Sequence, residues 1–534
     1  MLLDLDPPRV APLDLPRNGA GLAPGSSEEA ARFDALQTAF LDQFEHVFPD
    51  PKAPRTVVVV PSLTLPQDEL RKIDGATHYE ERMLFALMLL RMPRTRVVYV
   101  TSQPLPPGIV DYVLNLLAGV PSVHARERLT LLACHDHSDR PLTQKLLDRP
   151  RLLDRIRRQI ADPTAAHLTV FNATELERTL AVRLGIPLYA CDPALRHLGT
   201  KSGSREIFRE AGVPLPDGFE HLHTPAEIAH ALAVLKQRNP ALRKAVVKLD
   251  EGFSGEGNAI FSYAGAPASL CSGDTLERWI ADVLPERLQF EAKTETWDHY
   301  AASFAAMGGI VEAFVDGARK TSPSVQCRVD PTGRASVIST HEQVLGGPSG
   351  QVFLGCTFPA AAPYRLALQD AGERIGAVLA ERGALGRFGV DFLCVEDPAT
   401  ENGWRYVAIE INLRKGGTTH PYLMLDFLTD GAYDPETGLY CTPSGQPRYY
   451  YASDNLTSER YRGLTPYDLV DLAVYHGLHF HGATQEGVVF HLIGALSEFG
   501  KLGVLCIGAT PERAQALYDE TVALLDRETA ATMV

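Results

Sequence analysis

The chain has 534 residues, too many for a single hydrophobic core, so we expect two to four domains. Its formal net charge of −15 argues against a general nucleic-acid binder, whose surface would be basic. The longest apolar run, near residues 83–90, is too short to cross a membrane. Eight cysteines lie scattered without a paired framework, which favours the reducing cytoplasm over secretion.

The first 200 residues predict an arm followed by a layered domain. Residues 1–27 are rich in proline and glycine and lack the basic start of a signal peptide, so we expect a flexible N-terminal arm. Over residues 28–199, short apolar strands such as 56–61, 96–101 and 168–171 alternate with helical periodicity. This alternation is typical of a parallel, Rossmann-like α/β domain.

The rest of the chain predicts three sections of α+β type. Residues 200–310 open with a helix and contain two strands joined by a glycine-rich loop. Residues 311–428 contain strands, a long amphipathic helix and an acidic hairpin, and residues 429–534 form a C-terminal α+β segment. The predicted fold class is therefore α/β and α+β, with a Rossmann-like domain in front of two α+β subdomains.

A glycine-rich loop at residues 250–257, here called the flap, separates the two strands. Its glycines Gly252, Gly255 and Gly257 run G-x-x-G-x-G, whereas a dinucleotide site needs G-x-G-x-x-G followed by a helix. Backbone N–H groups of such a loop can close over phosphates, and Lys248 just before it supplies a point charge. A plain hairpin with a glycine-rich tip is the alternative.

An apolar strand at residues 309–317 carries a single acid, Glu312, before it ends in a turn. The alternating backbone donors and acceptors of such a strand could bind an adenine edge. Glu312 could then accept a hydrogen bond from the exocyclic amine of that base. An ordinary strand between two domains is the alternative.

An acidic hairpin is predicted around a turn at residues 396–404, which are rich in Asp, Asn and Gly. Folding about its midpoint near Thr400 places Asp391 opposite Glu410, and alternation puts Asn412 on the same face as Glu410. The buried face then takes the apolar residues Val407, Ile409 and Ile411. Two carboxylates and an amide oxygen suit Mg²⁺, which also binds phosphate oxygens. A solvated sheet face with incidental acids is the alternative.

The order of these features resembles the ATP-grasp superfamily of carboxylate–amine ligases. Along the chain come Lys201, Lys248 with the flap, Glu312, Asp391 and a Glu410-x-Asn412-x-Arg414 motif. The segment 412–421 looks like the substrate loop of amino-acid and peptide ligases in that superfamily, and the chain from about residue 56 is similar to pheganomycin-type peptide ligases. The resemblance implies a pre-ATP-grasp domain at 28–199, a small subdomain at 200–310 and a large subdomain with the metal site at 311–428.

The resemblance also implies roles for individual residues. ATP would be bound by Lys201, Lys248, Gly252, Ser254, Gly255, Gly257, Glu312 and Val315. One or two Mg²⁺ ions would be held by Asp391, Glu410 and Asn412. A substrate carboxylate would be bound by Gly416, Gly417 and Thr418. The catalytic candidates are Arg414, which would neutralise the transferring phosphoryl group, together with Arg328 and His341.

The activity that the resemblance implies is amide-bond formation through an acyl phosphate. ATP would phosphorylate a carboxylate, an amine would attack the product, and ADP and phosphate would be released. ATP and Mg²⁺ are the implied cofactors, and an amino acid or peptide would supply the carboxylate or the amine. A carboxylase-type ATP-grasp enzyme and a non-catalytic ATP-binding switch are the alternatives. We expect no nucleic-acid or membrane partner and a cytoplasmic location, and a homo-oligomer is compatible with the sequence.

Histidine-containing segments offer further hypotheses. His341 could orient or deprotonate the amine, and residues 341–350 could form a second lid, but a structural histidine is the stronger alternative. The run 134–137 and the histidines near residues 476–491 contain metal-ligand types without zinc spacing, so we expect core or surface roles there.

Overall fold

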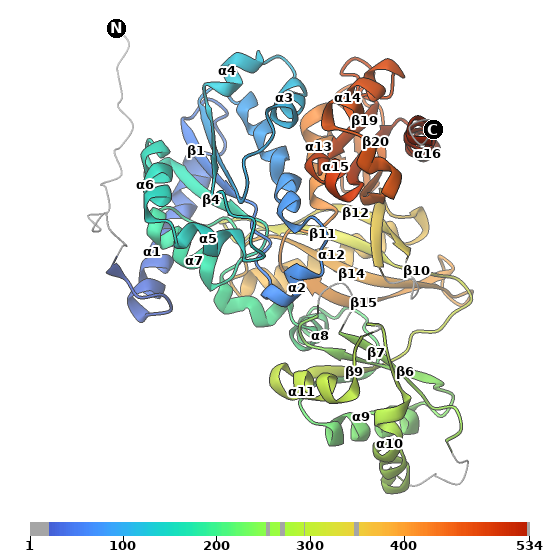
Figure 1. Ribbon diagram of the computed structural model, residues 1–534. Coiled ribbons are helices and arrows are strands. Elements are labelled where there is room, and N and C mark those ends of the chain that lie inside the picture. The colour runs from blue at the N-terminus through green and yellow to red at the C-terminus, as the bar shows by residue number, and fades with distance from the viewer. Residues whose placement is uncertain (1–20, 253–256, 267–272, 293, 347–351, 531–534) are drawn as a thin grey trace.

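The computed structural model describes residues 21–252, 257–266, 273–292, 294–346 and 352–530 (Figure 1). Within these ranges the strands form a parallel four-stranded sheet, an antiparallel five-stranded sheet, an antiparallel nine-stranded sheet and a short two-stranded hairpin. No helix in the described ranges combines the length and the apolarity that a bilayer span requires.

The N-terminal sheet is parallel, which confirms the prediction from alternating strands and helices. Its strand order is β3 (Leu129–Ala133), β2 (Thr95–Thr101), β1 (Arg55–Val60) and β4 (Ala166–Val170). Val58 and Val60 contact a core with α1 (Ser27–His46), α5 (Leu142–Leu147), α6 (Pro150–Gln159) and α7 (Glu175–Leu184). Val57 and Val59 contact a second core with the 3₁₀ helix η2 (Ala76–Arg91) and with α3 (Pro107–Asn115). β1 is therefore buried on both faces, as its unbroken valine run predicts.

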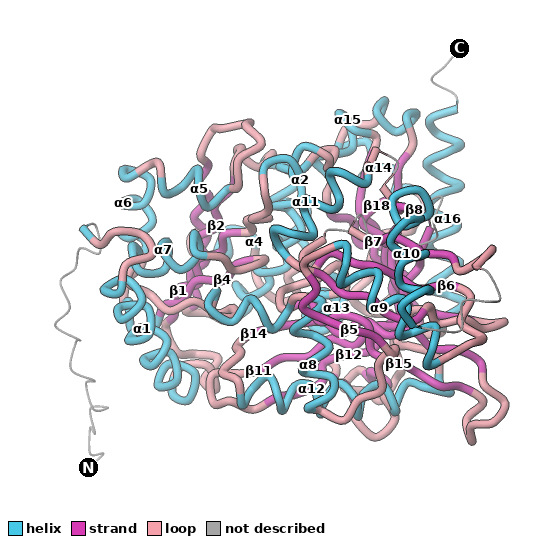
Figure 2. Tube along the Cα trace, turned by 90° about the horizontal axis from the view of Figure 1, so that it is seen from below, coloured by secondary structure: helices cyan, strands magenta, loops and turns pink. Residues whose placement is uncertain are grey.

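The five-stranded sheet presents one face to a core and the other to a cleft. Its order is β5 (Gly218–Leu222), β9 (Gly309–Ala313), β6 (Lys244–Leu249), β7 (Asn258–Ser262) and β8 (Leu288–Phe290). Helices α9 (Pro225–Arg238), α10 (Gly273–Arg287) and α11 (Trp297–Met307) share the core of its buried face. β6 and β7 pair as the two arms of the flap hairpin, which confirms that the flap joins two strands. In Figure 1 this sheet and its helices project below the rest of the molecule, and Figure 2 views the molecule from that side.

The nine-stranded sheet runs from the acidic hairpin to the C-terminus. Its order is β10 (Lys320–Thr321), β14 (Gly386–Glu396), β11 (Pro323–Val329), β12 (Ala335–Gly346), β13 (Val352–Phe358), β18 (Tyr449–Thr457), β20 (Lys501–Gly508) and β19 (Gly487–His491), with β15 (Trp404–Asn412) paired to β14. Helix α12 (Ala362–Glu381) shares a core with β11 and β14. The C-terminal strands therefore extend this sheet through the pairing of β13 with β18.

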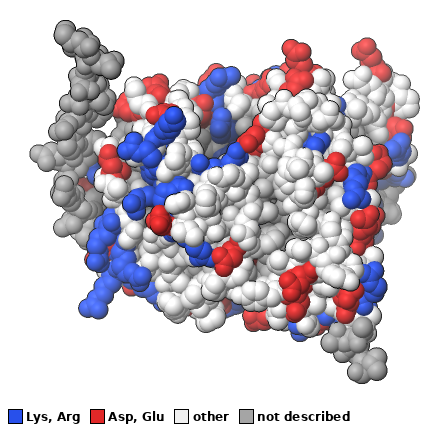
Figure 3. All heavy atoms as spheres, turned by 90° about the horizontal axis from the view of Figure 1, so that it is seen from above, with Lys and Arg blue, Asp and Glu red and all other residues white. Residues whose placement is uncertain are grey.

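One core joins the two ends of the chain. Residues of η2 and α3 pack there with α13 (Thr419–Thr429), β18, β20 and α16 (Pro511–Ala530). Helix α8 (Lys201–Glu210) lies between the five-stranded sheet and β15. The remaining elements are α2 (Gln67–Arg71), α4 (Ser122–Arg126), β16 (Ala432–Asp434), β17 (Leu439–Cys441), α14 (Pro466–Tyr475) and α15 (Leu496–Phe499), with short 3₁₀ turns between them. On the face drawn in Figure 3, Lys and Arg gather toward the N-terminal side, and acidic side chains are scattered.

Candidate active site

The acidic hairpin has the register that the sequence predicts. Asp391 of β14 lies directly opposite Glu410 of β15, and the turn spans residues 397–403, centred on Thr400. One detail of the prediction is wrong: the ladder is irregular between Asp391 and the next pair, so Ile409 is a bulged residue that lines the cleft. Ala408 lies in the core at the position that was predicted for Ile409. A bulge re-aims the side chains beside it, and here it turns consecutive residues toward the cleft.

Asp391 is held by two amides. Gln343 of β12 donates from Nε2 to Oδ1 at 2.6 Å, and Asn412 donates from Nδ2 to Oδ2 at 2.9 Å. Burial, together with the charge of Glu410, raises the pKa of Asp391 to about 7. A buried carboxylate beside a second carboxylate is costly unless a cation compensates it, so this pair provides the chemistry of a cation site.

The donor set fits Mg²⁺. Two carboxylates and one amide oxygen are hard ligands, and Mg²⁺ completes its shell with waters and substrate phosphates. No cluster of three or more His, Cys, Asp or Glu side chains that could hold a metal occurs in the described ranges. Asp391, Glu410 and Asn412 are the residues that would hold Mg²⁺, and water and phosphate oxygens would take its remaining coordination positions.

Lys201 brings a positive charge to the hairpin from the start of α8. Its Nζ lies 2.9 Å from Glu410 Oε1. Burial would raise the pKa of Glu410, but the charge of Lys201, with smaller effects from Lys248 and Arg414, outweighs it and lowers that pKa. Glu410 therefore carries its negative charge in the site.

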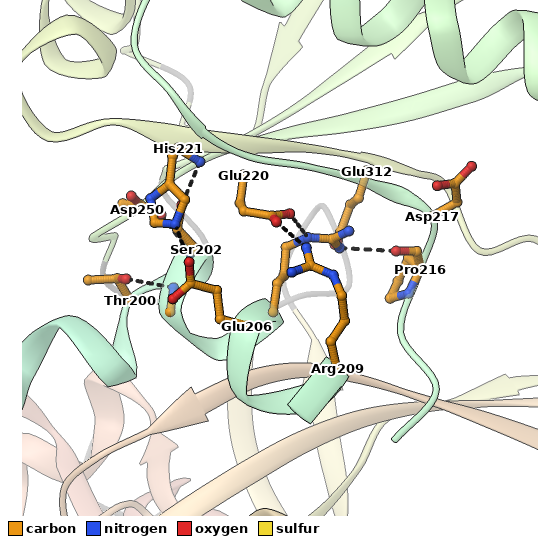
Figure 4. A network of polar contacts seen from close by, with 12 residues as sticks. Thr200, Ser202, Glu206, Arg209, Pro216, Asp217, Glu220, His221, Asp250 and Glu312 are labelled. Atoms are coloured by element: carbon orange, nitrogen blue, oxygen red, sulfur yellow. Dashed lines mark hydrogen bonds and ion pairs between the residues drawn. The ribbon is translucent and has the colours of Figure 1, made fainter. Parts of the chain in front are cut away.

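The N-terminus of α8 is tied to the base of the flap. The Thr200 hydroxyl caps the helix by accepting from Gly203 N at 3.0 Å, and Asp250 Oδ1 accepts from Ser202 N at 2.7 Å (Figure 4). Asp250 is a residue that the sequence argument missed, because nothing in the flap indicated that this acid would bind a helix terminus. Its contact fixes α8 against the strand that carries Lys248.

Glu312 neutralises two cations at once. Lys248 Nζ forms an ion pair with its Oε1, and Arg205 Nη1 donates to its Oε2 at 3.3 Å. Arg205 Nε also donates to Glu220 Oε2 at 3.1 Å (Figure 4). Glu312 and Val315 both line the cleft. Their contact with adenine stays a prediction. The pairing of Glu312 with Lys248 was not predicted.

The flap is described only at its base. Gly252 and Gly257 face each other closely: a Cβ placed on Gly252 would lie 3.3 Å from Gly257 Cα. Ser254 and Gly255, predicted to bind ATP, lie outside the described residues, as do residues 347–350 of the predicted lid at 341–350. The first part of that lid, residues 341–346, belongs to β12.

The substrate loop follows the hairpin directly. Arg414 lies among the charges of Glu410, Arg82 and Asp391, and burial lowers its pKa. Gly416 N donates to Thr419 Oγ1 at 3.0 Å, so this predicted substrate donor already has an acceptor. A Cβ on Gly417 would lie 2.7 Å from the Phe353 ring, so the glycine permits close packing.

Gln326 anchors this loop from β11. Its Nε2 donates to Thr418 O at 2.6 Å, and its Oε1 accepts from the Thr419 hydroxyl at 3.1 Å. Gln326 and Gln343 were not predicted, although both are polar residues in otherwise apolar strands, and that is a signal that could have indicated them.

Two predicted catalytic residues lie elsewhere. His341 is 0% exposed, packs against the rings of Phe358 and Tyr450, and shares a 2.5 Å hydrogen bond with the Tyr450 hydroxyl. Its predicted catalytic role is wrong, because the side chain points into the core and burial lowers its pKa to about 3. The catalytic prediction for Arg328 is also wrong: it lines a separate crevice on the nine-stranded sheet, beside Arg387.

Of the other predicted site residues that the structure describes, all except Gly257 line one cleft of about 1050 Å³. Its flap side is lined by Lys201, Lys248, Gly252, Glu312, Val315, Asp391, Glu410, Asn412 and Arg414. Its other side, here called the Arg82 side, is lined by Tyr79, Arg82, Phe171, Asp454, Asn455 and Lys501. The loop residues Gly416, Gly417 and Thr418 also line the cleft.

None of the residues on the Arg82 side was predicted to belong to the site. Arg82 lies over the rings of Tyr79 and Phe171, with its Cζ 4.3 and 4.7 Å from their centroids, and its Nη1 lies 3.1 Å from Asp454 Oδ2. Lys501 Nζ donates to the Tyr79 hydroxyl at 2.8 Å. These residues come from η2, from the position after β4, and from β18 and β20, and no local sequence pattern connects these elements.

Comparisons with known proteins agree with this geometry. A family described as IQCH-like, ATP-grasp matches residues 193–267 and 274–436, and a family described as PGM1 C-terminal domain matches residues 468–521. The chain is 33% identical over 466 residues to L-propargylglycine–L-glutamate ligase of Streptantibioticus cattleyicolor, covering 85% of this chain and 91% of that protein. It is 26% identical over 385 residues to IQ motif-containing protein H of Danio rerio, covering 65% of this chain and 36% of that protein.

Among solved structures, a biotin carboxylase–β,γ-ATP complex from Campylobacter jejuni superposes with a TM-score of 0.50 at 12% identity. The match covers 86% of this chain and 89% of that one, and it shows a common fold. The chain belongs to the ATP-grasp ligases: it is an ATP- and Mg²⁺-dependent enzyme that forms carbon–nitrogen bonds between a carboxylate and an amine through an acyl phosphate.

Proposed function

We propose that the enzyme joins the carboxylate of one amino acid to the amine of another. The observation that carries the proposal is the continuity of one cleft, with the acidic hairpin on its flap side and cationic side chains on its Arg82 side. A relative of 33% identity is an L-propargylglycine–L-glutamate ligase. We therefore propose L-glutamate as one substrate and an apolar amino acid as the other.

The flap side would bind ATP. Lys201 and Lys248 are each paired with a glutamate, so a phosphate tail that binds them replaces one acidic partner by another. The N-terminal turn of α8 adds the positive end of a helix dipole. Mg²⁺, held by Asp391, Glu410 and Asn412, would neutralise phosphate charge and activate the γ-phosphoryl group for transfer. Arg414 would stabilise the charge on that group as it moves to the substrate carboxylate.

The Arg82 side would bind a carboxylate that does not react. Two aromatic rings and Asp454 fix the Arg82 guanidinium, and its buried Nε has no acceptor within the described ranges. Lys501 makes no ion pair with a carboxylate in the same part of the chain, and its bond to Tyr79 uses one of three donors. A dicarboxylic amino acid would thus place one carboxylate here and the other near Arg414.

The same cleft offers an apolar surface for the second amino acid. Leu63, Ile73, Phe171 and Phe353 line it, and Phe353 lies against Gly417 of the substrate loop. Holding the amine beside the acyl phosphate contributes on the order of 7–11 kcal/mol to catalysis when the geometry is good. Water must be excluded meanwhile, and we propose that closure of the flap does this.

The test is ADP release by the full-length enzyme with ATP, Mg²⁺ and amino acids, offered singly and in pairs, with product masses measured. We expect release that needs both glutamate and an apolar amino acid, and one new amide product. Release that depends on bicarbonate alone would instead identify a carboxylase-type reaction. Tight ATP binding with no release on any pair would favour the switch alternative.

We also propose that the enzyme works in the cytoplasm. All seven cysteines of the described ranges are free thiols, and six of them are buried. Proteins of oxidising compartments usually pair such residues, whereas reducing compartments keep them as thiols.

A further inference from the structure

A second crevice, separate from the active-site cleft, lies on the nine-stranded sheet. Its volume is about 880 Å³. It is lined by residues of β11, β12, β14, α12 and α13, including Arg328, Arg334, Arg387 and Tyr422. No residue lines both this crevice and the active-site cleft.

Two arginines of this crevice lie side by side on neighbouring strands. Arg328 of β11 is directly opposite Arg387 of β14 in the antiparallel ladder. Like charges directly opposite each other destabilise a sheet, since their Cβ atoms are only about 5 Å apart. Two partly buried guanidiniums in this register therefore oppose folding unless something compensates their charge.

The described part of the chain supplies that compensation only in part: Tyr189, Tyr422 and Asp426 act to raise the pKa of Arg387, but burial and the charge of Arg328 outweigh them. Neither arginine has a carboxylate within 4 Å there, and Arg328 Nε and Arg387 Nη1 are buried without an acceptor. Burial and the neighbouring charge of Arg328 both lower the pKa of Arg387. The charge of Arg387 also acts on Lys415, whose pKa burial lowers to about 7.

Three acids also face the crevice. Glu373 and Glu381 lie exposed on α12, toward solvent. Asp426 of α13 is nearer: burial raises its pKa, and the charge of Arg387 only partly opposes this. In the described part of the chain none of the three forms an ion pair with Arg328 or Arg387, so Arg328 Nε and Arg387 Nη1 keep donors for a ligand.

We propose that Arg328 and Arg387 form a binding site for a small oxyanion, a phosphate or carboxylate group, distinct from the ATP site. Guanidinium forks bind such groups with two parallel hydrogen bonds, which gives both strength and orientation. Tyr422 lines the same crevice, and its hydroxyl provides a further donor. An anion bound there removes the repulsion between the two strands.

The test uses full-length protein whose active-site cleft is saturated with Mg²⁺ and a non-hydrolysable ATP analogue. Inorganic phosphate and malonate are titrated separately by calorimetry, at an ionic strength kept constant with chloride. We expect at least one of the two anions to bind at a single site. Binding in the phosphate titration would indicate a phosphate ligand, and binding in the malonate titration would indicate a carboxylate ligand. Arg328→Gln and Arg387→Gln should each weaken binding about tenfold, as expected for losing a charge-assisted hydrogen bond.

A matched control and a stability measurement guard against misfolded variants. Arg334→Gln changes an exposed arginine at the same crevice and should alter affinity less than about threefold. Without anion, Arg387→Gln should unfold at a higher temperature than the wild type, because repulsion is relieved, and added anion should stabilise only the wild type. Absence of anion binding to the wild type, or equal binding by all three variants, would overturn the proposal.

Discussion

The two sides of the cleft hold their charges in different ways. On the flap side, Lys201 and Lys248 each pair with a glutamate, and Asp391 is held by two amides. On the Arg82 side, Arg82 pairs with Asp454, but Lys501 is bound by a phenol instead of an acid. The flap side is therefore a network whose members depend on one another, whereas the Arg82 side keeps positive charge for a ligand. Changes on the flap side should cost more, because removing one partner leaves a buried charge uncompensated.

Glu410→Gln should have the largest effect. It removes a metal ligand and the partner of Lys201, so we expect ADP release to fall at least about 1000-fold, which corresponds to roughly 4 kcal/mol. Circular dichroism should show an unchanged fold. Glu401→Gln, in the exposed turn of the same hairpin, is the matched control and should keep normal activity. Near-normal turnover of Glu410→Gln would remove the hairpin from the metal site.

Lys248→Ala should weaken nucleotide binding more than it slows chemistry. The variant loses one phosphate contact and leaves Glu312 with Arg205 alone, so we expect about 10- to 100-fold weaker binding of an ATP analogue. Calorimetry with Mg²⁺ measures it. Lys244→Ala, at the exposed start of the same strand, provides the comparison. Unchanged affinity would place Lys248 outside the nucleotide site.

Lys501→Gln tests the other side of the cleft. We expect the KM for the acid substrate to rise about tenfold while ATP-analogue affinity stays constant, because one charge-assisted contact to a carboxylate is lost. Steady-state kinetics with the acid varied at saturating ATP gives the value. Lys52→Gln, on an exposed loop before β1, controls for loss of surface charge. A rise in the KM for ATP instead would show that the two sides of the cleft do not divide as proposed.

The same contrast explains what could be predicted from sequence. The hairpin is local: its turn residues and its alternation fix the register, so Asp391 and Glu410 could be paired from the sequence alone. The parallel N-terminal sheet was predictable for a similar reason, since strand and helix periods alternate there. The bulge at Ile409 was not, because it depends on how β15 packs against both the cleft and the core.

The Arg82 side and the glutamine anchors could not be predicted. Arg82 lies more than 300 residues before Asp454 and Lys501 in the sequence, and the shared core of η2, β18 and β20 brings the three together. Arg328 and His341 failed for another reason: each has a chemically suitable side chain on a strand near the site, but the packing of the sheet directs it elsewhere.

Two adjacent glycines of the substrate loop give a smaller and sharper test. A Cβ at Gly417 would meet the Phe353 ring at 2.7 Å, whereas a Cβ at Gly416 would meet nothing within 4 Å. Gly417→Ala should lower kcat/KM about fivefold, which corresponds to about 1 kcal/mol of overpacking. Gly416→Ala should stay within about twofold of wild type. Equal effects would mean that the loop does not pack against Phe353 during turnover.

His341→Leu should have the smallest effect on catalysis and a clear effect on stability. The buried Tyr450 hydroxyl loses its partner, which costs about 1–3 kcal/mol, while kcat and its pH profile should not change. Burial lowers the pKa of His341 to about 3, whereas the unfolded chain titrates near 6.5. Protons therefore bind the unfolded state preferentially between these values, and the wild type loses stability as pH falls from about 6.5 toward 3. Urea unfolding at several pH values should show a shallower loss in the variant. A shifted pH profile of kcat with unchanged stability would return His341 to the catalytic site.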